Sequence, residues 1–219
     1  MTEQEWLACD NPDQMLDLIR QRSASGQASP HWLKRLVFRR TASCPPGTRR
    51  KLFLLAIACA RRNPEFRRRD SLFEAFERRA DELVSRRGPR LRGNKSTSSP
   101  HGESSVWLEV LCATETGMLE MRQEGFGATE PERKARCDFV RDIFPYPLHP
   151  AAFDQAWRSP PVVGLGQSIY ADQAFDRLPI LADALFDAGC TDQSILDHCR
   201  SAGPHVRGCW VVDLVLGNG

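Results

Sequence analysis

The feature that most constrains the fold is the spacing of apolar residues in the last part of the chain. They recur at steps of three and four residues: Leu178, Leu181, Leu185 and Ala188. This spacing places side chains on one face of an α-helix. Pro179 suits the first turn of such a helix and Gly189 suits its end. Alternation typical of β-strands is not found at useful length anywhere in the sequence, so we expect an all-α fold.

The rest of this C-terminal block, up to Gly219, continues in the same way. Oxygen-bearing side chains around Asp192 predict the start of a second helix, which ends before the breaker pair Gly203-Pro204. The segment 208–216 pairs apolar residues four positions apart, which indicates a buried helix ended by Gly217. Its Val and Leu residues would also suit a strand.

Similar start and stop signals along the chain predict roughly eight to ten helices, packed irregularly. We divide the chain into an N-terminal helical part with Arg-rich helices, 1–85, a flexible linker or loop, 86–105, and a C-terminal helical part, 106–219. The linker holds three Gly, two Pro and a single large apolar residue, Leu91. Such a composition is typical of a mobile basic loop. We expect the two helical parts to pack together as one domain.

Several segments resemble a family of planctomycete proteins of unknown function. They are the C-terminal LPILADALFDAGC, ILDHCR and GPHVRGCWVVDLVLG, the opening MTEQEWLACDNPDQML, and the internal RKLFLLAIACARR and CDFVRDIFPYP. The resemblance covers both ends of the chain and parts of the middle. Between about Arg86 and Ser105 the sequence departs from the family pattern. It implies a bacterial intracellular protein and points to no reaction.

Composition and the N-terminal sequence indicate the cellular compartment in which we expect the protein. No stretch approaches the eighteen or more apolar residues that a membrane helix needs. The opening MTEQEWLACD lacks the basic and apolar regions of a secretory signal, so we expect a cytoplasmic protein without membrane contact. The eight cysteines are scattered, mostly within apolar patterns. We interpret them as reduced thiols that pack as small apolar side chains.

The strongest concentration of reactive side chains consists of five residues: Cys190, His198, Cys199, His205 and Cys209. Thiolates and imidazoles are zinc ligands. The tight spacings of strong zinc motifs are absent, however, and free cysteines are commonly core residues. We therefore expect no cofactor, no convergence of four of these residues, and apolar neighbours for Cys199 and Cys209.

A thiol-dependent enzyme is the other reading of this set. Neighbouring residues on a helix point about 100° apart, which places His198 badly for activating Cys199. His205 precedes Cys209 by four residues, so these two have a geometry that permits contact. A nucleophile also needs an orienting partner, for which Asp197 and Asp213 are available, and a site for the developing charge, which the sequence does not show.

Basic residues gather in the middle of the chain. Residues 31–95 contain nineteen Lys and Arg against six Asp and Glu, although the whole chain is only +2. Candidate contacts for an anion or nucleic acid are Arg49, Arg50, Lys51, Arg61, Arg62, Arg67, Arg68 and Arg69. Such residues neutralise phosphates without reading sequence. A solvated helix face, or pairing with acids elsewhere in the chain, is the alternative.

His205, Arg207 and Trp210 have a structural interpretation. His205 follows the breaker pair and is placed to hold the turn, whereas Arg207 is placed to meet Asp183, Asp187 or Asp213. Because no reaction centre is evident, we expect a non-enzymatic module that binds a protein partner. A nucleic-acid-associated protein and a zinc- or thiol-dependent enzyme are the alternatives. The oligomeric state is not determined by the sequence.

Overall fold

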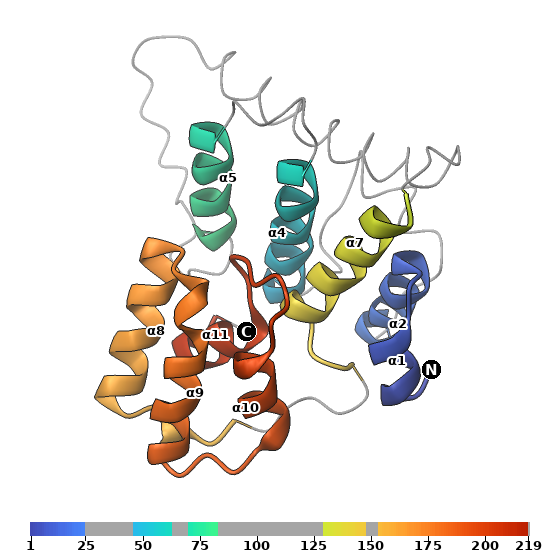
Figure 1. Cartoon of the computed structure of the whole chain (residues 1–219). Helices are drawn as coiled ribbons and strands as arrows, with labels where there is room; N and C mark the ends of the chain where they lie inside the picture. Colours follow the sequence, from blue (N-terminus) through green and yellow to red (C-terminus); the bar gives the residue numbers. More distant parts are fainter. Residues whose placement is uncertain (25–45, 63–69, 83–128, 148–152, 219) are drawn as a thin grey trace, which may run out of the picture. The chain divides into compact units, whose positions relative to one another are not determined.

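The computed structural model describes residues 1–24, 46–62, 70–82, 129–147 and 153–218. All regular elements within these ranges are helical, which confirms the predicted all-α class (Figure 1). The α-helices are α1 (Glu3–Ala8), α2 (Pro12–Ala24), α4 (Pro46–Arg62), α5 (Asp70–Glu82), α7 (Glu130–Ile143), α8 (Pro160–Asp172), α9 (Leu178–Asp187), α10 (Gln193–Arg200) and α11 (Trp210–Leu216). Among these described helices, none has the length and apolar character to span a membrane. The predicted mobile loop at 86–105 lies outside the described residues.

The chain forms two compact units whose limits differ from the predicted division. The first unit combines Met1–Ser25 with Pro131–Gly219, and the second is Gly26–Glu130. The difference arises because the first helices pack with residues far along the chain. The spacing of residues within a segment carries no information on contacts between segments far apart in the chain. For this reason the sequence suggested a division into 1–85 and 106–219. A single domain made of both parts stays a prediction.

In the first unit, α1 is joined to α7. The predicted capping box of α1 is present, with Glu5 N–H donating to Thr2 Oγ1 at 3.2 Å and Thr2 N–H donating to Glu5 Oε2 at 2.7 Å. The guanidinium of Arg141 on α7 donates to the carbonyl oxygens of Trp6 and Cys9. These carbonyls lie near the C-terminal end of α1, where backbone acceptors lack helical partners. Arg141 of α7 thus supplies hydrogen-bond donors to the C-terminal end of α1.

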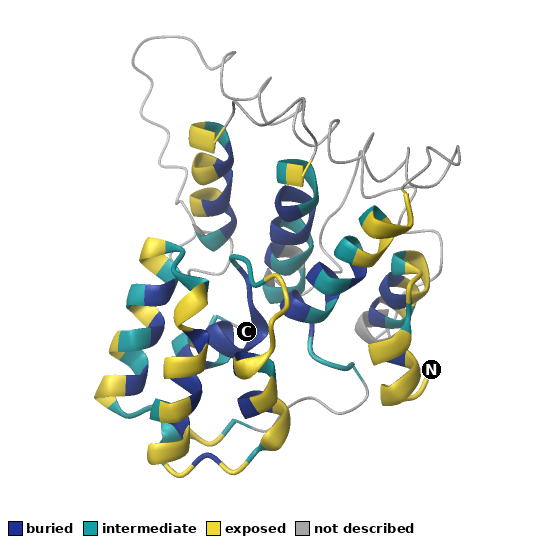
Figure 2. Ribbon diagram, viewed as in Figure 1, coloured by how far each residue is buried: buried dark blue, intermediate teal, exposed yellow. Residues whose placement is uncertain are grey.

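The C-terminal block of the same unit consists of α8 to α11 around one apolar core (Figure 2). Asp192 begins α10 by accepting from the N–H groups of Ser194 and Ile195. Gly189, at φ 90°, and Gly217, at φ 75°, follow α9 and α11 in the left-handed conformation that favours glycine. The last segment is therefore the predicted buried helix, because its four-residue apolar spacing prevails over the strand preference of Val.

Gly166 permits a close approach of α8 and α11. A Cβ at this position would lie 2.9 Å from Cγ1 of Val215, closer than packed carbons approach. A Cβ at Gly164, two residues earlier, would meet no atom within 4 Å, so the close approach depends on Gly166 alone. Arg158, which precedes α8, donates from Nη2 to the carbonyl of Leu214 at 2.6 Å and so caps the end of α11.

The second unit is described through the pair α4 and α5. Its apolar core comprises Leu54, Ile57, Phe73, Phe76 and Ala80. Pro46 begins α4. A proline is tolerated there because the first N–H groups of a helix have no intrahelical partner. Arg50 is fully buried and donates from Nε to Asp81 Oδ1 at 2.8 Å.

Candidate metal centre

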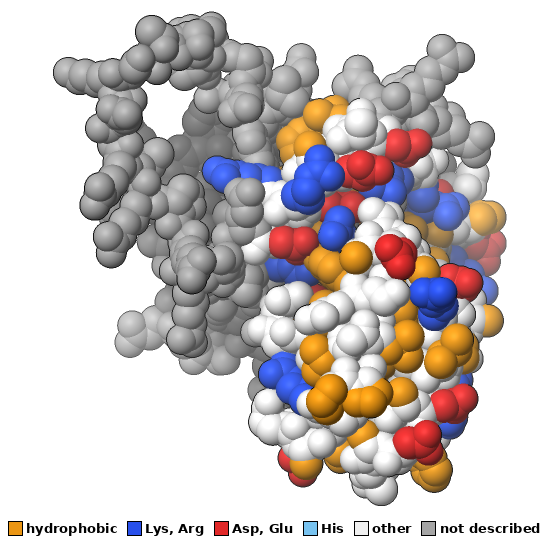
Figure 3. Space-filling model, turned by 90° about the vertical axis from the view of Figure 1, so that its left-hand side faces the viewer, with side chains coloured by type: hydrophobic (Ala, Val, Ile, Leu, Met, Phe, Trp, Pro, Cys, Tyr) orange, Lys and Arg blue, Asp and Glu red, His pale blue; other side chains and the backbone are white. Residues whose placement is uncertain are grey.

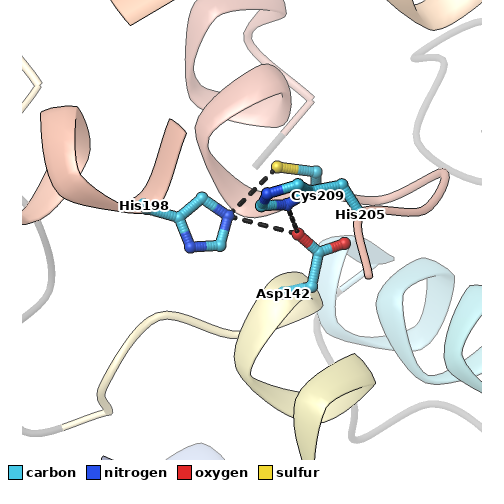
Figure 4. A group of neighbouring side chains, drawn as sticks. All are labelled: Asp142, His198, His205 and Cys209. Atoms are coloured by element: carbon cyan, nitrogen blue, oxygen red, sulfur yellow. Dashed lines mark hydrogen bonds and ion pairs between the residues drawn. The ribbon is translucent and has the colours of Figure 1, made fainter. Parts of the chain in front are cut away.

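Four side chains with metal-ligating atoms meet where α7 approaches the C-terminal block (Figure 4). They are Asp142, His198, His205 and Cys209, and one ligand atom from each lies within 4.8 Å of all the others. We call these four residues the polar cluster. None of the four side chains is more than 14% exposed. The cluster is therefore closed to solvent on most sides.

The polar cluster contains three of the five residues that the sequence singled out. Cys190 and Cys199 are instead part of the apolar core, as expected of packed thiols. Cys209 also belongs to this core, as expected, but its Sγ lies 3.3 Å from His198 Nε2 as well, a polar contact that the sequence did not suggest. Three of the five residues converge and not four, and Asp142 supplies the fourth ligand from outside the set. An acid between the apolar residues Val140 and Ile143 was the available signal.

Helix geometry explains how the C-terminal block directs its side chains. His198 and Cys199 are neighbours on α10 and point in different directions, Cys199 into the core and His198 into the polar cluster. The angular argument against a His198–Cys199 pair therefore holds. After the turn at Gly203 the chain returns past His205, and Gly208, at φ 98°, leads into α11. This return places His205 and Cys209 opposite His198.

Asp142 is the acceptor at the centre of the polar cluster. Its Oδ1 lies 2.6 Å from His205 Nδ1 and 3.2 Å from His198 Nε2, and its Oδ2 accepts from Val206 N–H at 2.8 Å. Burial alone would raise the pKa of Asp142, but hydrogen bonds and charge from His198 and His205 hold it below its ordinary value. The side chain is thus a carboxylate at neutral pH.

Both ring nitrogens of His205 face oxygen atoms. Nδ1 faces Asp142, whereas Nε2 lies 3.3 Å from both the carbonyl oxygen and Oγ of Ser201. The Ser201 hydroxyl donates its proton to the carbonyl of His198 at 2.8 Å, so its oxygen is left as an acceptor for His205. Burial lowers the pKa of His205, but the hydrogen bond and charge of Asp142 raise it above the ordinary value overall. This network favours an imidazolium.

The hydrogen bond from Trp210 defines the proton position on His198. Trp210 Nε1 lies 3.1 Å from His198 Nδ1. Because an indole N–H is a donor only, Nδ1 must be the acceptor. The proton of the neutral ring is then on Nε2, the atom that faces Asp142 and Cys209. His198 is therefore a donor toward the centre of the polar cluster.

Cys209 is a neutral thiol in this arrangement. Burial raises its pKa well above the ordinary value, and the charge of Asp142 raises it further. The neighbouring Nε2 of His198 already carries a proton and has no lone pair to accept another. Cys209 thus lacks the activation that a nucleophilic thiol requires. The same holds for Cys199, whose pKa burial raises to about 12.

The residues with a predicted structural role are placed as follows. Trp210 is buried, and His205 ties its turn to Asp142 and Ser201. The guanidinium of Arg207 lies 4.4 Å from the ring centre of Tyr170, a cation–π contact. Pairing of Arg207 with an acid of this block stays a prediction.

The candidate basic contacts are only partly described. Arg50 is buried against Asp81, and Arg61 forms an ion pair with Glu77 at 3.0 Å, so both arginines pair with acids of α5. Arg50 therefore has no surface with which to contact a nucleic acid. The side chain of Arg49 and residues 67–69 lie outside the described residues. A basic binding surface thus stays a prediction.

Exposed apolar side chains lie on α9. Ile180 is 57% exposed and Phe186 61% exposed, in a block whose other large apolar residues are mostly covered. Figure 3 shows hydrophobic side chains among uncharged surface on the lower part of the face in view. Nothing in the described residues shows what would cover them. The protein-interaction module stays a prediction.

Comparison with protein-family models, curated proteins and solved structures gives no match. The resemblance to the planctomycete family therefore stays a prediction.

Proposed function

We propose that this is a metal-binding protein in which the polar cluster holds one structural zinc ion. The observation that carries the proposal is the convergence of a carboxylate, two imidazoles and a thiol within 4.8 Å of one another. A packed core thiol or a lone buried ion pair explains each residue singly. Neither explains why four ligand atoms of the types that zinc prefers face one point.

The spacing of the ligand atoms suits a tetrahedral ion. Zinc bonds of about 2.0–2.3 Å separate the ligand atoms of a tetrahedron by about 3.3–3.6 Å. His198 Nε2 lies 3.3 Å from Cys209 Sγ and 3.2 Å from Asp142 Oδ1. The pair of His205 Nδ1 and Asp142 Oδ1, at 2.6 Å, is a hydrogen bond that would have to open for the ion. Small side-chain movements therefore suffice.

Charge favours a divalent ion in this buried place. One carboxylate and one thiolate balance the two charges of zinc, so the loaded centre would be neutral. The protons now directed into the polar cluster, on His198, His205 and Cys209, would leave their positions. Neutral charge avoids the cost of an uncompensated ion away from water.

The ligand types and their burial also define the kind of metal site. Mg²⁺ and Ca²⁺ prefer oxygen ligands throughout, whereas nitrogen with sulfur favours zinc. Four protein ligands leave no open position for a substrate, which is typical of structural zinc. Asp142 and His205 are 63 positions apart in the chain. The ion would therefore fasten α7 to the C-terminal block.

Metal content of the purified protein tests this proposal. We expect one zinc per chain by elemental analysis, and a thiolate-to-metal absorption band after replacement of zinc by Co²⁺. Cys209→Ser should remove the band and weaken zinc binding at least tenfold, as loss of a ligand does. Cys199→Ser is the matched control, since this thiol is equally buried but lies outside the polar cluster. It should keep both the band and the zinc.

Two results would contradict the proposal. One is protein that is folded but binds no zinc above background when metal is supplied. The other is an equal loss of metal in both cysteine variants, which would indicate that binding depends on core packing and not on Cys209 as a ligand.

A further inference from the structure

The two histidines of the polar cluster differ in what their outer nitrogens meet. His205 directs Nδ1 into the cluster, and its outer nitrogen, Nε2, lies 3.3 Å from the carbonyl oxygen of Ser201. A histidine that binds metal usually donates its other N–H to a carbonyl or carboxylate. His205 thus has the outer partner that a metal ligand needs.

His198 has the opposite environment. It directs Nε2 into the cluster, and its outer nitrogen, Nδ1, faces the N–H of Trp210 at 3.1 Å. A neutral imidazole that binds an ion through Nε2 carries its proton on Nδ1. Two N–H groups would then point at each other. The buried indole cannot turn its N–H aside without moving the whole ring.

We infer that Trp210 is a positioning residue that opposes metal binding by holding His198 in the tautomer with its proton on Nε2. This inference rests on the proposed function. Binding of zinc breaks the Trp210–His198 hydrogen bond, so the indole or the imidazole shifts as the ion enters. Because Trp210 is the first residue of α11, the shift begins at the start of that helix. Trp210 therefore sets the zinc affinity and reports whether zinc is bound.

A purely packing role for Trp210 is the alternative. Its ring centre lies 4.9 Å from that of His198, which is ordinary contact between rings. Phenylalanine keeps an aromatic ring in this place and removes the N–H. The two roles therefore predict different effects of the same substitution.

The experiment measures zinc affinity of the full chain by competition with a chelator at one fixed pH. Trp210→Phe should bind zinc about fivefold more tightly than the unaltered chain, which corresponds to a hydrogen bond of about 1 kcal/mol. Trp157→Phe is the matched control. Trp157 packs edge-on against Phe153 and lies outside the polar cluster, so its substitution should leave the affinity unchanged.

A second measurement uses the unaltered chain and does not depend on how the variant folds. Nitrogen NMR of the histidine rings should place the His198 proton on Nε2 without metal and on Nδ1 with zinc. The indole N–H signal of Trp210 should move on loading, whereas that of Trp157 should stay. A residue that only packs would leave the tautomer of His198 unaffected.

The outcomes separate this inference from the proposed function. Zinc binding with unchanged or weaker affinity in folded Trp210→Phe overturns the inference and leaves the zinc site standing. So does a His198 proton that is already on Nδ1 before zinc is added. An unaltered chain that binds no zinc overturns both.

Discussion

The helix pair α4–α5 and the polar cluster both bury charged groups, yet they do so in different ways. In the helix pair, Arg50 donates to Asp81 at 2.8 Å and Arg61 forms an ion pair with Glu77 at 3.0 Å, so cations and acids match across two adjacent helices. In the polar cluster, the single carboxylate of Asp142 receives two imidazoles, and the thiol of Cys209 lies alongside.

A binding site and a structural ion pair differ in how many ligand atoms they bring together. In the helix pair, Arg50 and Arg61 each lie beside one acid of the same chain. The polar cluster brings two ring nitrogens, one sulfur and one carboxylate oxygen within 4.8 Å of one another, which is more ligand atoms than one ion pair uses. Convergence of ligand atoms, and not burial of charge by itself, therefore marks the functional candidate.

The largest expected effect is that of Asp142→Asn. It removes the only carboxylate of the cluster from beside a buried imidazolium, and such a loss costs about 3–5 kcal/mol. Urea unfolding with a chelator present measures it. Asp138→Asn is the control one turn earlier on α7. Its ion pair with Arg141 is partly exposed, so it should cost about 0.5 kcal/mol. Equal losses in the two variants would mean that the buried Asp142 contributes no more to the free energy of unfolding than the partly exposed Asp138.

Arg50→Ala is the corresponding change in the helix pair. It should lower the free energy of unfolding by about 2 kcal/mol, because a buried side chain and a charge-assisted hydrogen bond are lost. The loss should be the same with zinc and with chelator, since no ligand of the cluster lies on α4 or α5. Arg78→Ala, whose pair with Glu74 is exposed, serves as the control and should change little. If the loss of unfolding free energy in Arg50→Ala depended on zinc, the helix pair and the polar cluster would not be energetically independent.

The smallest effect concerns pH without metal. The raised pKa of His205 means that its stabilisation is present below the unfolded pKa and is lost as pH rises through the folded value. The lowered pKa of Asp142 means that its stabilisation is present above the unfolded pKa and is lost as pH falls through the folded value. Their pair therefore stabilises most between these limits. His205→Gln should cost about 1 kcal/mol more at pH 5.5 than at pH 8.5.

Urea unfolding at both pH values, with chelator, measures this difference. Arg50→Ala should lose the same amount at each pH, because a guanidinium stays charged throughout. A His205→Gln loss that grows toward high pH would mean that His205 is neutral beside Asp142.

Local features of the sequence predicted much of the fold and part of the site. Pro179, Gly189 and Gly217 act on their own helices, so they showed where α9 and α11 begin or end. His198 was correctly separated from Cys199 by helix geometry. Asp142 was missed because its partners lie 56 or more positions downstream, beyond the reach of any periodic pattern. The hydrogen bond of Trp210 to His198 depends on ring orientations that spacing does not encode.

The two neighbouring residues Arg141 and Asp142 of α7 also determine when long-range contacts can form during synthesis of the chain. Arg141 contacts the carbonyl of Trp6, 135 positions earlier, and Asp142 contacts His205, 63 positions later. A ribosome adds about 5–20 residues per second, so α1 waits about 7–27 s for the side chain that closes it. During that interval the buried Trp6 lacks Tyr146, whose ring centre lies 6.2 Å from its own in the finished unit, so part of its apolar surface is exposed until α7 has been made.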